Sequence, residues 1–359
     1  MYLHDHRLPH VLQPADYSSA EQYRRELRHV FLDAWHLVGT TADLRGAKGT
    51  LDLTLLGHPL RVQLVGDELR VRYSPHDRRG EQASPWRVAR CGQLVFVSLA
   101  EDGPSLAAQL GEFYDVCQER FGDEARQSLS WDVEYPVNWK IPIENSTEAY
   151  HVPAVHPGTF KESPSEARSR HRLEAGFTSF GTRLPFSPHS RFDAVFQRLE
   201  GSFVRWMGGE PTTDYWLHHV FPSLLLTFTD TLSLCQTVLP TSPTTARGLV
   251  RQFGCFADAR HRWQRTLAAG WGRIAAAITR QILSEDMRLY PAIQRGLSAS
   301  RNRGVLGCCE ERVHAFQCFI RERCDKPSAE PATTVVAETD SAHGVDGLPC
   351  ETTLREACR

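Results

Sequence analysis

The spacing of apolar residues predicts a helical segment followed by a small β-rich unit. Residues 16–36 carry apolar side chains at helical spacing, and Ser18 with Glu21 forms a capping-box pattern at their start. From residue 51 to residue 99 the period changes to two. Apolar and polar residues alternate on both sides of Gly66, which is typical of an antiparallel hairpin, and a second strand pair is expected before residue 99.

Longer elements are predicted further along the chain. We expect helices over 101–125, 139–150 and 260–297, and strands over 214–237 and 245–255. The apolar stripe of the first helix is Leu106, Leu110, Phe113 and Val116, and that of the last is Trp263, Leu267, Trp271, Ile274, Ile278, Ile282, Leu289 and Ile293. The intervening residues 161–210 are polar and rich in arginine, and they are interpreted as loops or short helices over a pocket.

Two histidines and two carboxylates stand close together in the stretch 138–160. His151 and His156 are five residues apart, and Glu144 and Glu148 precede them in an otherwise apolar and aromatic context. Imidazole nitrogens beside acidic side chains suit a first-row transition metal, because the carboxylate orients the ring that binds. The same spacing also fits histidines that only pack in a core, and it does not decide between the two interpretations.

Prolines restrict how this stretch folds. Pro153 and Pro157 exclude a regular helix through both histidines. We therefore expect Glu148 and His151, three residues apart, to share one helix face, and His156 to follow in a turn.

A distant carboxylate is the candidate for a third metal ligand. Asp286 falls on the apolar stripe predicted for 260–297, where a carboxylate is costly unless it is paired or bound to a metal. Glu285, one position away, is the competing candidate at the edge of the stripe. His151, His156 and Asp286 fit the two-histidine, one-carboxylate triad of non-haem iron(II) enzymes in residue type, although sequence spacing alone does not join Asp286 to the histidines.

Composition excludes several classes of function. The chain of 359 residues has room for two or three domains, and its net charge of -2 gives no bulk attraction to nucleic acid or to an anionic membrane. We expect no signal peptide and no membrane span, and hence a cytoplasmic protein. The ten cysteines form no pair of CxxC motifs, so a zinc ribbon is not supported and free thiols are expected.

The focal stretch resembles a known signature. Its pattern NWK…EN…E.YH….HP.TF is similar to the iron-binding signature of the catalytic α subunit of Rieske-type non-haem iron ring-hydroxylating oxygenases. The similarity extends to three further segments, which are Tyr17-Ser18…Glu26…Phe31…Trp35, Tyr215…Phe221-Pro222-Ser223, and Glu285-Asp286…Gln294-Arg295-Gly296-Leu297. The nearest branch resembles the choline and betaine monooxygenase-like group.

The resemblance implies a site and an activity. It makes His151, His156 and Asp286 the ligands of a mononuclear Fe(2+), Glu148 the acid that links incoming electrons to an iron histidine, and Asn145 a pocket residue near the metal. The implied reaction is the oxidation of a small organic substrate with O2, by a monooxygenase or dioxygenase.

The resemblance also implies an α+β fold. The catalytic domain would be a helix-grip antiparallel sheet around a long C-terminal helix, preceded by a small all-β Rieske-like domain. We expect a helical segment over 1–40 that packs on the catalytic domain, the degenerate Rieske-like domain over 41–130, the catalytic domain over 131–325, and a disordered tail over 326–359.

The expected cluster ligands are missing. A Rieske cluster requires two cysteines and two histidines, normally as CxH and CxxH. Ser74 stands where the first cysteine is needed, two residues before His76, and no CxxH follows. We therefore expect no [2Fe–2S] cluster in this chain.

The missing cluster leaves three interpretations open. In the first, a separate electron-transfer protein or Rieske-containing subunit supplies the electrons, and the chain assembles as a homotrimer or a heteromer. In the second, the chain is a non-catalytic subunit or ligand-binding paralogue. In the third, it performs metal-assisted hydrolysis or another non-redox reaction. The substrate is not identified. An aromatic pocket for an alkylammonium group could be formed by four candidates, but ordinary core packing is the favoured interpretation for them; they are Trp206, Tyr215, Trp216 and Phe228.

Overall fold

The largest element is a seven-stranded antiparallel sheet in a computed structural model. The structure describes all residues except 1, 5, 75–83, 186–188, 255–261 and 326–359. In spatial order the strands are β8 (Arg126–Tyr135), β14 (Thr245–Gly254), β13 (Leu232–Ser242), β12 (Leu224–Phe228), β11 (Asp214–Val220), β10 (Phe177–Arg183) and β9 (Arg170–Leu173). Strands β9 to β14 lie side by side in chain order, with α7 inserted between β10 and β11, and β8, from earlier in the chain, pairs with β14 at one edge.

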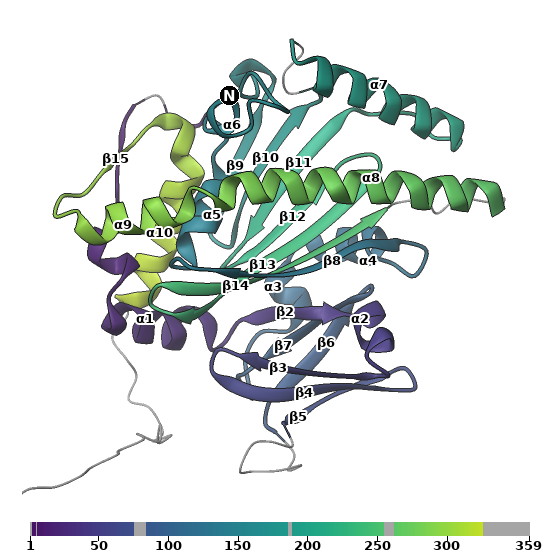
Figure 1. The fold of residues 1–359 in the computed structure, drawn as a ribbon. Coiled ribbons are helices and arrows are strands. Elements are labelled where there is room, and N and C mark those ends of the chain that lie inside the picture. The colour runs from purple at the N-terminus through teal and green to yellow at the C-terminus, as the bar shows by residue number, and fades with distance from the viewer. Residues whose placement is uncertain (1, 5, 75–83, 186–188, 255–261, 326–359) are drawn as a thin grey trace, which may run out of the picture. The chain divides into compact units, whose positions relative to one another are not determined.

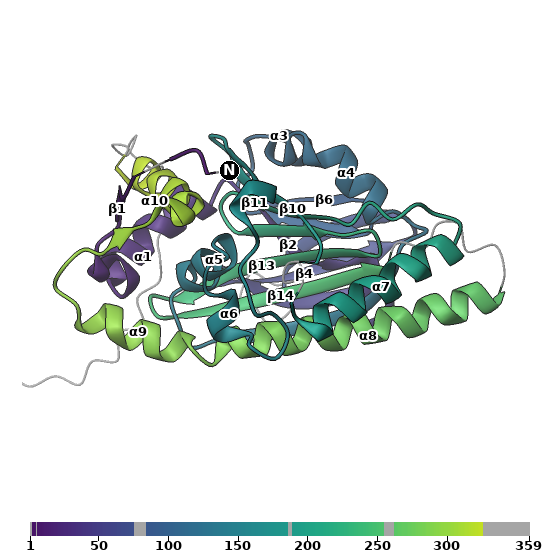
Figure 2. The ribbon, with the colours of Figure 1, turned by 90° about the horizontal axis from the view of Figure 1, so that it is seen from above.

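A long helix crosses one face of this sheet. Helix α8 (Arg262–Met287) runs over the strands and packs against β8 and β14, and α7 (Arg191–Trp206) lies beside it (Figures 1 and 2). Phe196 of α7 stacks on Trp271 of α8, with ring centroids 5.2 Å apart. The antiparallel sheet packed against one long helix confirms the predicted α+β fold class of the helix-grip type.

Shorter helices close one end of the sheet. They are α5 (Lys140–Thr147), α6 (Val152–Val155), α9 (Tyr290–Ala299) and α10 (Glu311–Cys324), with 3-10 turns η3 (Glu166–Arg168) and η4 (Cys308–Glu310). The N-terminal elements pack on α9 and α10, and they are β1 (Leu8–Pro9), η1 (Pro14–Tyr17), α1 (Ala20–Glu26) and the π-helical turn η2 (Leu27–Phe31). Strand β1 pairs with β15 (Val305–Leu306) from the other end of the described chain.

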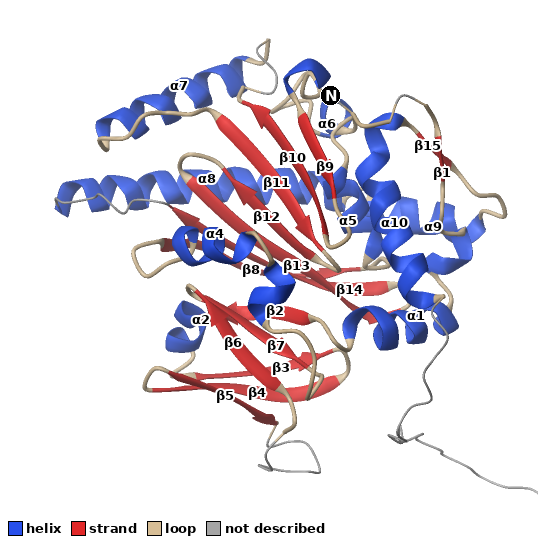
Figure 3. Cartoon of the chain, turned by 180° about the vertical axis from the view of Figure 1, so that it is seen from behind, coloured by secondary structure: helices blue, strands red, loops and turns tan. Residues whose placement is uncertain are grey.

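A small β unit is formed by two three-stranded sheets (Figure 3). One has the order β2 (Trp35–Thr40), β7 (Leu94–Ser98), β6 (Arg87–Cys91), and the other has the order β3 (Thr50–Leu55), β4 (His58–Val65), β5 (Glu68–Tyr73). Helix α2 (Thr41–Gly46) follows β2, and α3 (Leu106–Leu110) and α4 (Phe113–Arg120) connect the unit to β8. The predicted hairpin across Gly66 is confirmed, because Val65 pairs with Glu68.

One apolar cluster joins the small β unit to the large sheet. Leu55 and Val62 of the unit belong to the same buried cluster as Val133 and Leu249 of the sheet. Residues 1–325 accordingly form one compact unit. The predicted boundaries at residues 40 and 130 stay predictions, and the predicted tail over 326–359 lies outside the described residues.

Two predicted helices near the N-terminus are wrong in their extent. The segment 16–36 contains the end of η1, then α1 and η2, and its helical part ends at Phe31 because Trp35 already begins β2. Ser19 rather than Ser18 caps α1, since the Ser19 side chain accepts the Gln22 N–H. The segment 101–125 is divided into α3 and α4 by Gly111, which has a φ of 53°. This break turns Val116 of the predicted stripe toward solvent.

The interpretation of 161–210 as loops or short helices is also wrong. The segment contains β9, β10 and the 16-residue helix α7, which the Ser190 side chain caps by accepting the Asp193 N–H. Large apolar side chains of this helix are exposed, namely Phe192, Val195, Leu199 and Trp206, whereas Asp193 and Glu200 are buried.

The predicted helix over 260–297 is two helices with a different buried face. It breaks after Met287, and α9 begins with Pro291 in its first turn. Several stripe residues are exposed, namely Trp263, Leu267, Ile274, Leu289 and Ile293. The side facing the sheet contains Ala268, Ala275 and Ala276, whose short side chains allow close approach. No described helix has both the length and the apolar character that a membrane crossing requires.

Candidate metal centre

The two histidines flank the single turn of α6. His151 immediately precedes this helix and His156 ends it, where the His156 N–H donates to the Val152 carbonyl. Pro153 fits here because the first turn of a helix needs no N–H donor at that position. The short helix therefore brings both imidazoles to one side of the chain.

Glu148 does not share a helix face with His151, contrary to the prediction. Helix α5 ends at Thr147, and Glu148 follows it in an extended conformation. One Glu148 oxygen, Oε2, accepts the N–H groups of Tyr150 at 2.8 Å and His151 at 3.2 Å. The other oxygen, Oε1, is hydrogen-bonded to Nδ1 of His151. Glu148 thus fixes both the backbone and the ring of His151 from the link between two helices.

Asp286 meets both histidines from α8. Its Oδ1 lies 3.1 Å from Nε2 of His156 and 3.6 Å from Nε2 of His151. One potential ligand atom from each of the three residues lies within 4.8 Å of the others. The structure therefore brings together the three residues that spacing alone could not join.

A second carboxylate holds the His156 ring. Oε2 of Glu285 lies 2.8 Å from Nδ1 of His156, so this histidine contacts two adjacent residues of α8 through its two nitrogens. When Nδ1 of a histidine donates its proton to a carboxylate, Nε2 presents its lone pair to a metal. Both histidines have this arrangement, with Glu148 and Glu285 on the outer side.

The centre is buried and rich in negative charge. His156 is 2% exposed and Asp286 is 6% exposed. Burial alone would lower the pKa of His156, but the nearby carboxylates of Asp286 and Glu285 outweigh it and raise that pKa. Oδ1 of Asp286 is buried and accepts no hydrogen bond within the described chain, although Nε2 of His156 lies 3.1 Å away. A buried, unsatisfied carboxylate oxygen facing two imidazole nitrogens is the donor set that an iron(II) ion fits.

The other predicted site residues have different surroundings. Asn145 lines the cavity beside the histidines, and its Nδ2 donates to the Tyr290 hydroxyl at 3.5 Å. Glu144, the second acid of the focal stretch, is directed elsewhere. It accepts the Tyr17 hydroxyl at 2.5 Å and the Gln317 amide at 2.9 Å, and burial raises its pKa. Glu144 is therefore a core hydrogen-bonding group and not part of the centre.

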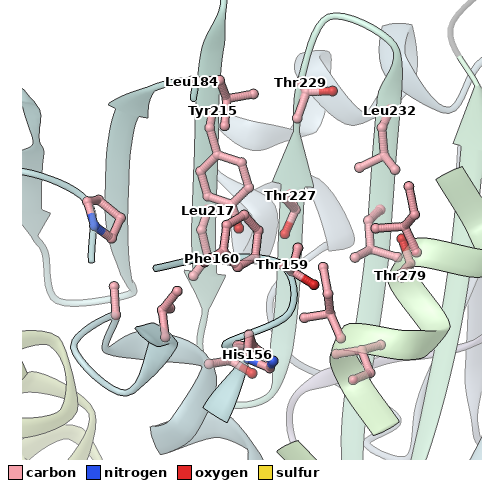
Figure 4. Close-up of a pocket in the computed structure, with 18 of the residues that line it drawn as sticks. His156, Thr159, Phe160, Leu184, Tyr215, Leu217, Thr227, Thr229, Leu232 and Thr279 are labelled. Carbon is pink, nitrogen blue, oxygen red and sulfur yellow. The ribbon is translucent and has the colours of Figure 1, made fainter. Parts of the chain in front are cut away.

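A cavity of about 260 Å³ extends from the centre between the sheet, α7 and α8. Figure 4 shows His156 at one end of this cavity and Thr229 at the other. Apolar side chains form most of its wall, interrupted by threonines on the strands and on α8. Such a space suits a small organic molecule with few polar groups.

Few of the aromatic candidates reach this cavity. Tyr215 lines it, as its place in Figure 4 shows. The next residue, Trp216, points to the opposite face of the sheet and packs with Phe228 in a second core cluster. Trp206 is exposed at the end of α7. Tyr215 alone of the four predicted residues is thus placed to contact a ligand.

The roles of two residues of the centre and cavity were not predicted. Glu285 was considered only as the competing metal ligand, whereas it contacts the outer nitrogen of His156. Arg312, in the first turn of α10, lines the cavity but belongs to none of the motifs identified in the sequence.

Known proteins resemble this chain in sequence and in fold. Residues 122–326 match the family described as "Ring hydroxylating alpha subunit (catalytic domain)". The glycine betaine monooxygenase oxygenase subunit of Pseudomonas aeruginosa is 27% identical over 101 residues, which are 28% of this chain and 23% of that protein. The carnitine monooxygenase oxygenase subunit of Escherichia coli is 23% identical over 229 residues, which are 62% of this chain and 54% of that protein. The chain thus spans about a quarter to a half of the length of these curated relatives.

Solved structures share the fold over most of the chain. The quaternary ammonium Rieske monooxygenase CntA superposes with a TM-score of 0.65 at 17% identity, covering 89% of this chain and 96% of that one. Naphthalene 1,2-dioxygenase superposes with a TM-score of 0.60 at 13% identity, covering 88% and 92% of the two chains. The fold similarity therefore includes the small β unit as well as the large sheet.

Proposed function

Because the chain belongs to the ring-hydroxylating α-subunit family, we propose that it is an oxygenase in which His151, His156 and Asp286 hold one Fe(2+) ion. The proposed reaction is the oxidation of a small organic substrate with O2. The observation that carries this proposal is the position of Asp286 Oδ1. This buried oxygen lacks a hydrogen-bond partner in the described chain and lies 3.1 Å and 3.6 Å from the two histidine Nε2 atoms.

The bound iron would supply open coordination positions at which O2 is activated. The protein's own groups prepare those positions. Glu148 and Glu285 keep the Nδ1 protons of the two histidines in place, so that Nε2 of each ring faces inward. The apolar walls of the cavity exclude bulk water from the substrate and leave the reacting end beside His156.

We assign the electron supply to a second protein. Ser74 occupies the position of an expected cluster cysteine, and the sequence offers no CxxH motif. His76 lies outside the described residues. Glu148 is the proposed connection between an incoming donor and the metal, because it is hydrogen-bonded to a ring whose other nitrogen faces the centre. A ferredoxin or a Rieske-containing subunit is the proposed donor, and a homotrimer or heteromer the proposed assembly.

The relatives suggest where to begin the search for a substrate. Two of them are named as monooxygenase subunits for glycine betaine and for carnitine, and these compounds are the first candidates here. The cavity of about 260 Å³ holds molecules of this size. Asn145, on the cavity wall beside His151, is the proposed polar contact near the reacting end.

Loss of the cluster ligands also favours a second function. The chain would then be a non-catalytic subunit that keeps the metal centre as structure, while a partner carries out the reaction. Activity of a purified heteromer that survives His151→Ala in this chain would support this second function and contradict the first.

Turnover can be tested without knowing the electron donor. Hydrogen peroxide supplies oxygen together with the electrons, so iron-loaded protein is mixed with peroxide and a panel of glycine betaine, carnitine and simple aromatic compounds. We expect an oxygenated or demethylated product by mass spectrometry from wild type and none from His156→Ala. No product from wild type with any compound, or equal yields from both proteins, would count against the proposed activity.

A further inference from the structure

Arg312 is a buried cation in the wall of the proposed substrate cavity. It is the second residue of α10 and is only 2% exposed. Its guanidinium carbon lies 4.6 Å from the centre of the Phe180 ring, and Phe180 lines the same cavity. Arg312 is the only lysine or arginine among the described residues of this wall.

This guanidinium forms no ion pair in the described part of the chain, although the Glu148 and Glu311 carboxylates act on it at longer range. None of its nitrogens forms a hydrogen bond or an ion pair there, and Nε is fully buried without an acceptor. Desolvation by burial lowers the pKa of Arg312 to about 10, which still leaves the group charged at neutral pH. A buried charge without a direct ion pair is costly. Pairing with Arg312 would therefore make the binding of an anionic ligand more favourable.

Two acidic side chains that line the same cavity outside the three proposed metal ligands are already engaged. Both oxygens of Glu148 are used by the backbone and ring around His151. Glu200 accepts the hydroxyl of Thr229 at 3.2 Å and that of Thr231 at 2.5 Å. Away from the metal centre, Arg312 is therefore the charged group of this wall with which an anionic ligand can pair.

Another buried arginine shows what a structural role looks like here. Arg251 has a nearly buried side chain and forms ion pairs with Asp43 at 2.6 Å and with Asp132 at 2.8 Å. Arg312 is as buried as Arg251 but forms no such ion pairs.

We propose that Arg312 binds a carboxylate of the substrate, so that the substrate class of this site is small organic carboxylates. A carboxylate can accept two parallel N–H bonds from one guanidinium, and a single buried cation matches a single negative charge. Phe180, which contacts Arg312, lines the cavity together with Tyr215 and Leu217, and these side chains suit the apolar remainder of the molecule. This inference rests on the proposed function for the identity of the cavity as a substrate site.

Matched ligand pairs test this assignment by binding alone. Anaerobic, iron-loaded protein without a reductant is titrated calorimetrically with carboxylates and their primary amides, using glycine betaine, carnitine, benzoate and phenylacetate with the amide of each. We expect at least one carboxylate to bind roughly tenfold or more tightly than its amide, as hydrogen bonds to a charged group predict. In Arg312→Gln that preference should disappear while amide binding is kept.

Three results would overturn the assignment. They are the absence of carboxylate binding to wild type, equal binding of acids and amides, and a preference that persists in Arg312→Gln. The last result would place the carboxylate elsewhere, including on the metal. Glu200→Gln is the matched control in the same cavity, and it should keep the carboxylate preference.

Two further measurements separate this inference from folding and from the proposed function. Arg312→Gln should melt no lower than wild type without ligand, whereas Arg251→Gln should melt several degrees lower because it breaks ion pairs. If Arg312→Gln does not fold, Arg312→Lys keeps the charge and should lose part of the preference. Iron content is measured on the same samples. If the protein binds no iron but still prefers carboxylates, only the proposed iron site is contradicted. If it binds iron but shows no such preference, only the role of Arg312 is contradicted.

Discussion

Nδ1 of His156 lies 2.8 Å from Oε2 of Glu285, the residue that directly precedes Asp286 on α8. The two neighbouring carboxylates therefore serve the two nitrogens of one ring, since Asp286 Oδ1 lies 3.1 Å from Nε2. Glu285 belongs to the centre as an orienting group, although its role differs from that of the three proposed ligands.

Replacing Glu285 by glutamine should weaken metal binding without abolishing it. The amide keeps the size of the side chain but loses the charge that holds the Nδ1 proton of His156. Loss of such an outer carboxylate typically costs about 10–100-fold in metal affinity. A chelator competition titration measures this change. Glu119→Gln, at an exposed position of α4, is the control and should bind metal like wild type. Equal affinities for the two variants would contradict the orienting role of Glu285.

Metal affinity should rise with pH. The Asp286 and Glu285 carboxylates raise the pKa of His156 in the metal-free protein, so a proton occupies the ring over a wider range and competes with the metal. Apparent affinity should therefore increase until the pH exceeds this raised pKa and then level off. In Asp286→Asn the pH dependence of any residual binding should shift to lower pH. A flat profile in wild type would contradict the competition.

Stability of the metal-free protein should show the opposite trend. A folded-state pKa raised above the unfolded value of about 6.5 contributes stability at low pH, which is lost as the pH rises through the folded value. Thermal melting of chelated protein from slightly acidic to alkaline pH should therefore fall more steeply than that of Asp286→Asn. Added iron should reverse the loss by binding the folded state. Parallel curves for the two proteins would contradict this linkage.

A buried ion pair behind the centre should be sensitive to single substitutions. Lys140 Nζ lies 2.6 Å from Glu26 Oε1, both side chains are buried, and Trp139 Nε1 donates to the other Glu26 oxygen at 2.8 Å. Lys140→Met leaves the Glu26 charge unpaired and should cost about 3–5 kcal/mol in the free energy of unfolding. Arg61→Met, which breaks a partly exposed pair, should cost under about 1 kcal/mol. Denaturant titration measures both, and similar losses would refute the distinction.

A glycine on β10 marks a close approach across the sheet. A Cβ at Gly181 would overlap the Trp216 ring on β11. Gly181→Ala should therefore destabilise the fold by about 1–3 kcal/mol, as overpacking does. Gly176→Ala, where a Cβ meets nothing within 4 Å, should change the free energy of unfolding little. Equal stability of the two variants in denaturant would contradict the predicted overlap.

Local patterns predicted the parts of this fold that depend on neighbours in sequence. Alternation around Gly66 identified a hairpin, and the prolines near His151 and His156 correctly excluded a continuous helix. The family resemblance supplied the α+β class and linked Asp286 to the histidines. Spacing alone could not make that link, because 129 residues lie between His156 and Asp286.

Side chains whose partners lie far away were predicted poorly. The stripe on 260–297 favoured large apolar residues, whereas the sheet accepts Ala275 and Ala276 at close range and leaves Ile274 exposed. Arg312 appeared to be an ordinary charged residue of a helix, and only the tertiary structure reveals it as a buried cation beside a cavity. Helix α7 was not predicted because 161–210 was judged by its polar, arginine-rich composition, and the burial of Asp193 and Glu200 depends on tertiary packing.

Anaerobic iron loading, followed by metal analysis and visible spectroscopy, tests the central claim most directly. The account predicts about one Fe(2+) per chain in wild type, no absorption from an iron–sulfur cluster, and loss of the iron in His156→Ala and Asp286→Asn. Glu119→Gln should load like wild type. Wild-type protein that takes up no iron, or iron that remains bound in His156→Ala, would contradict the proposed centre.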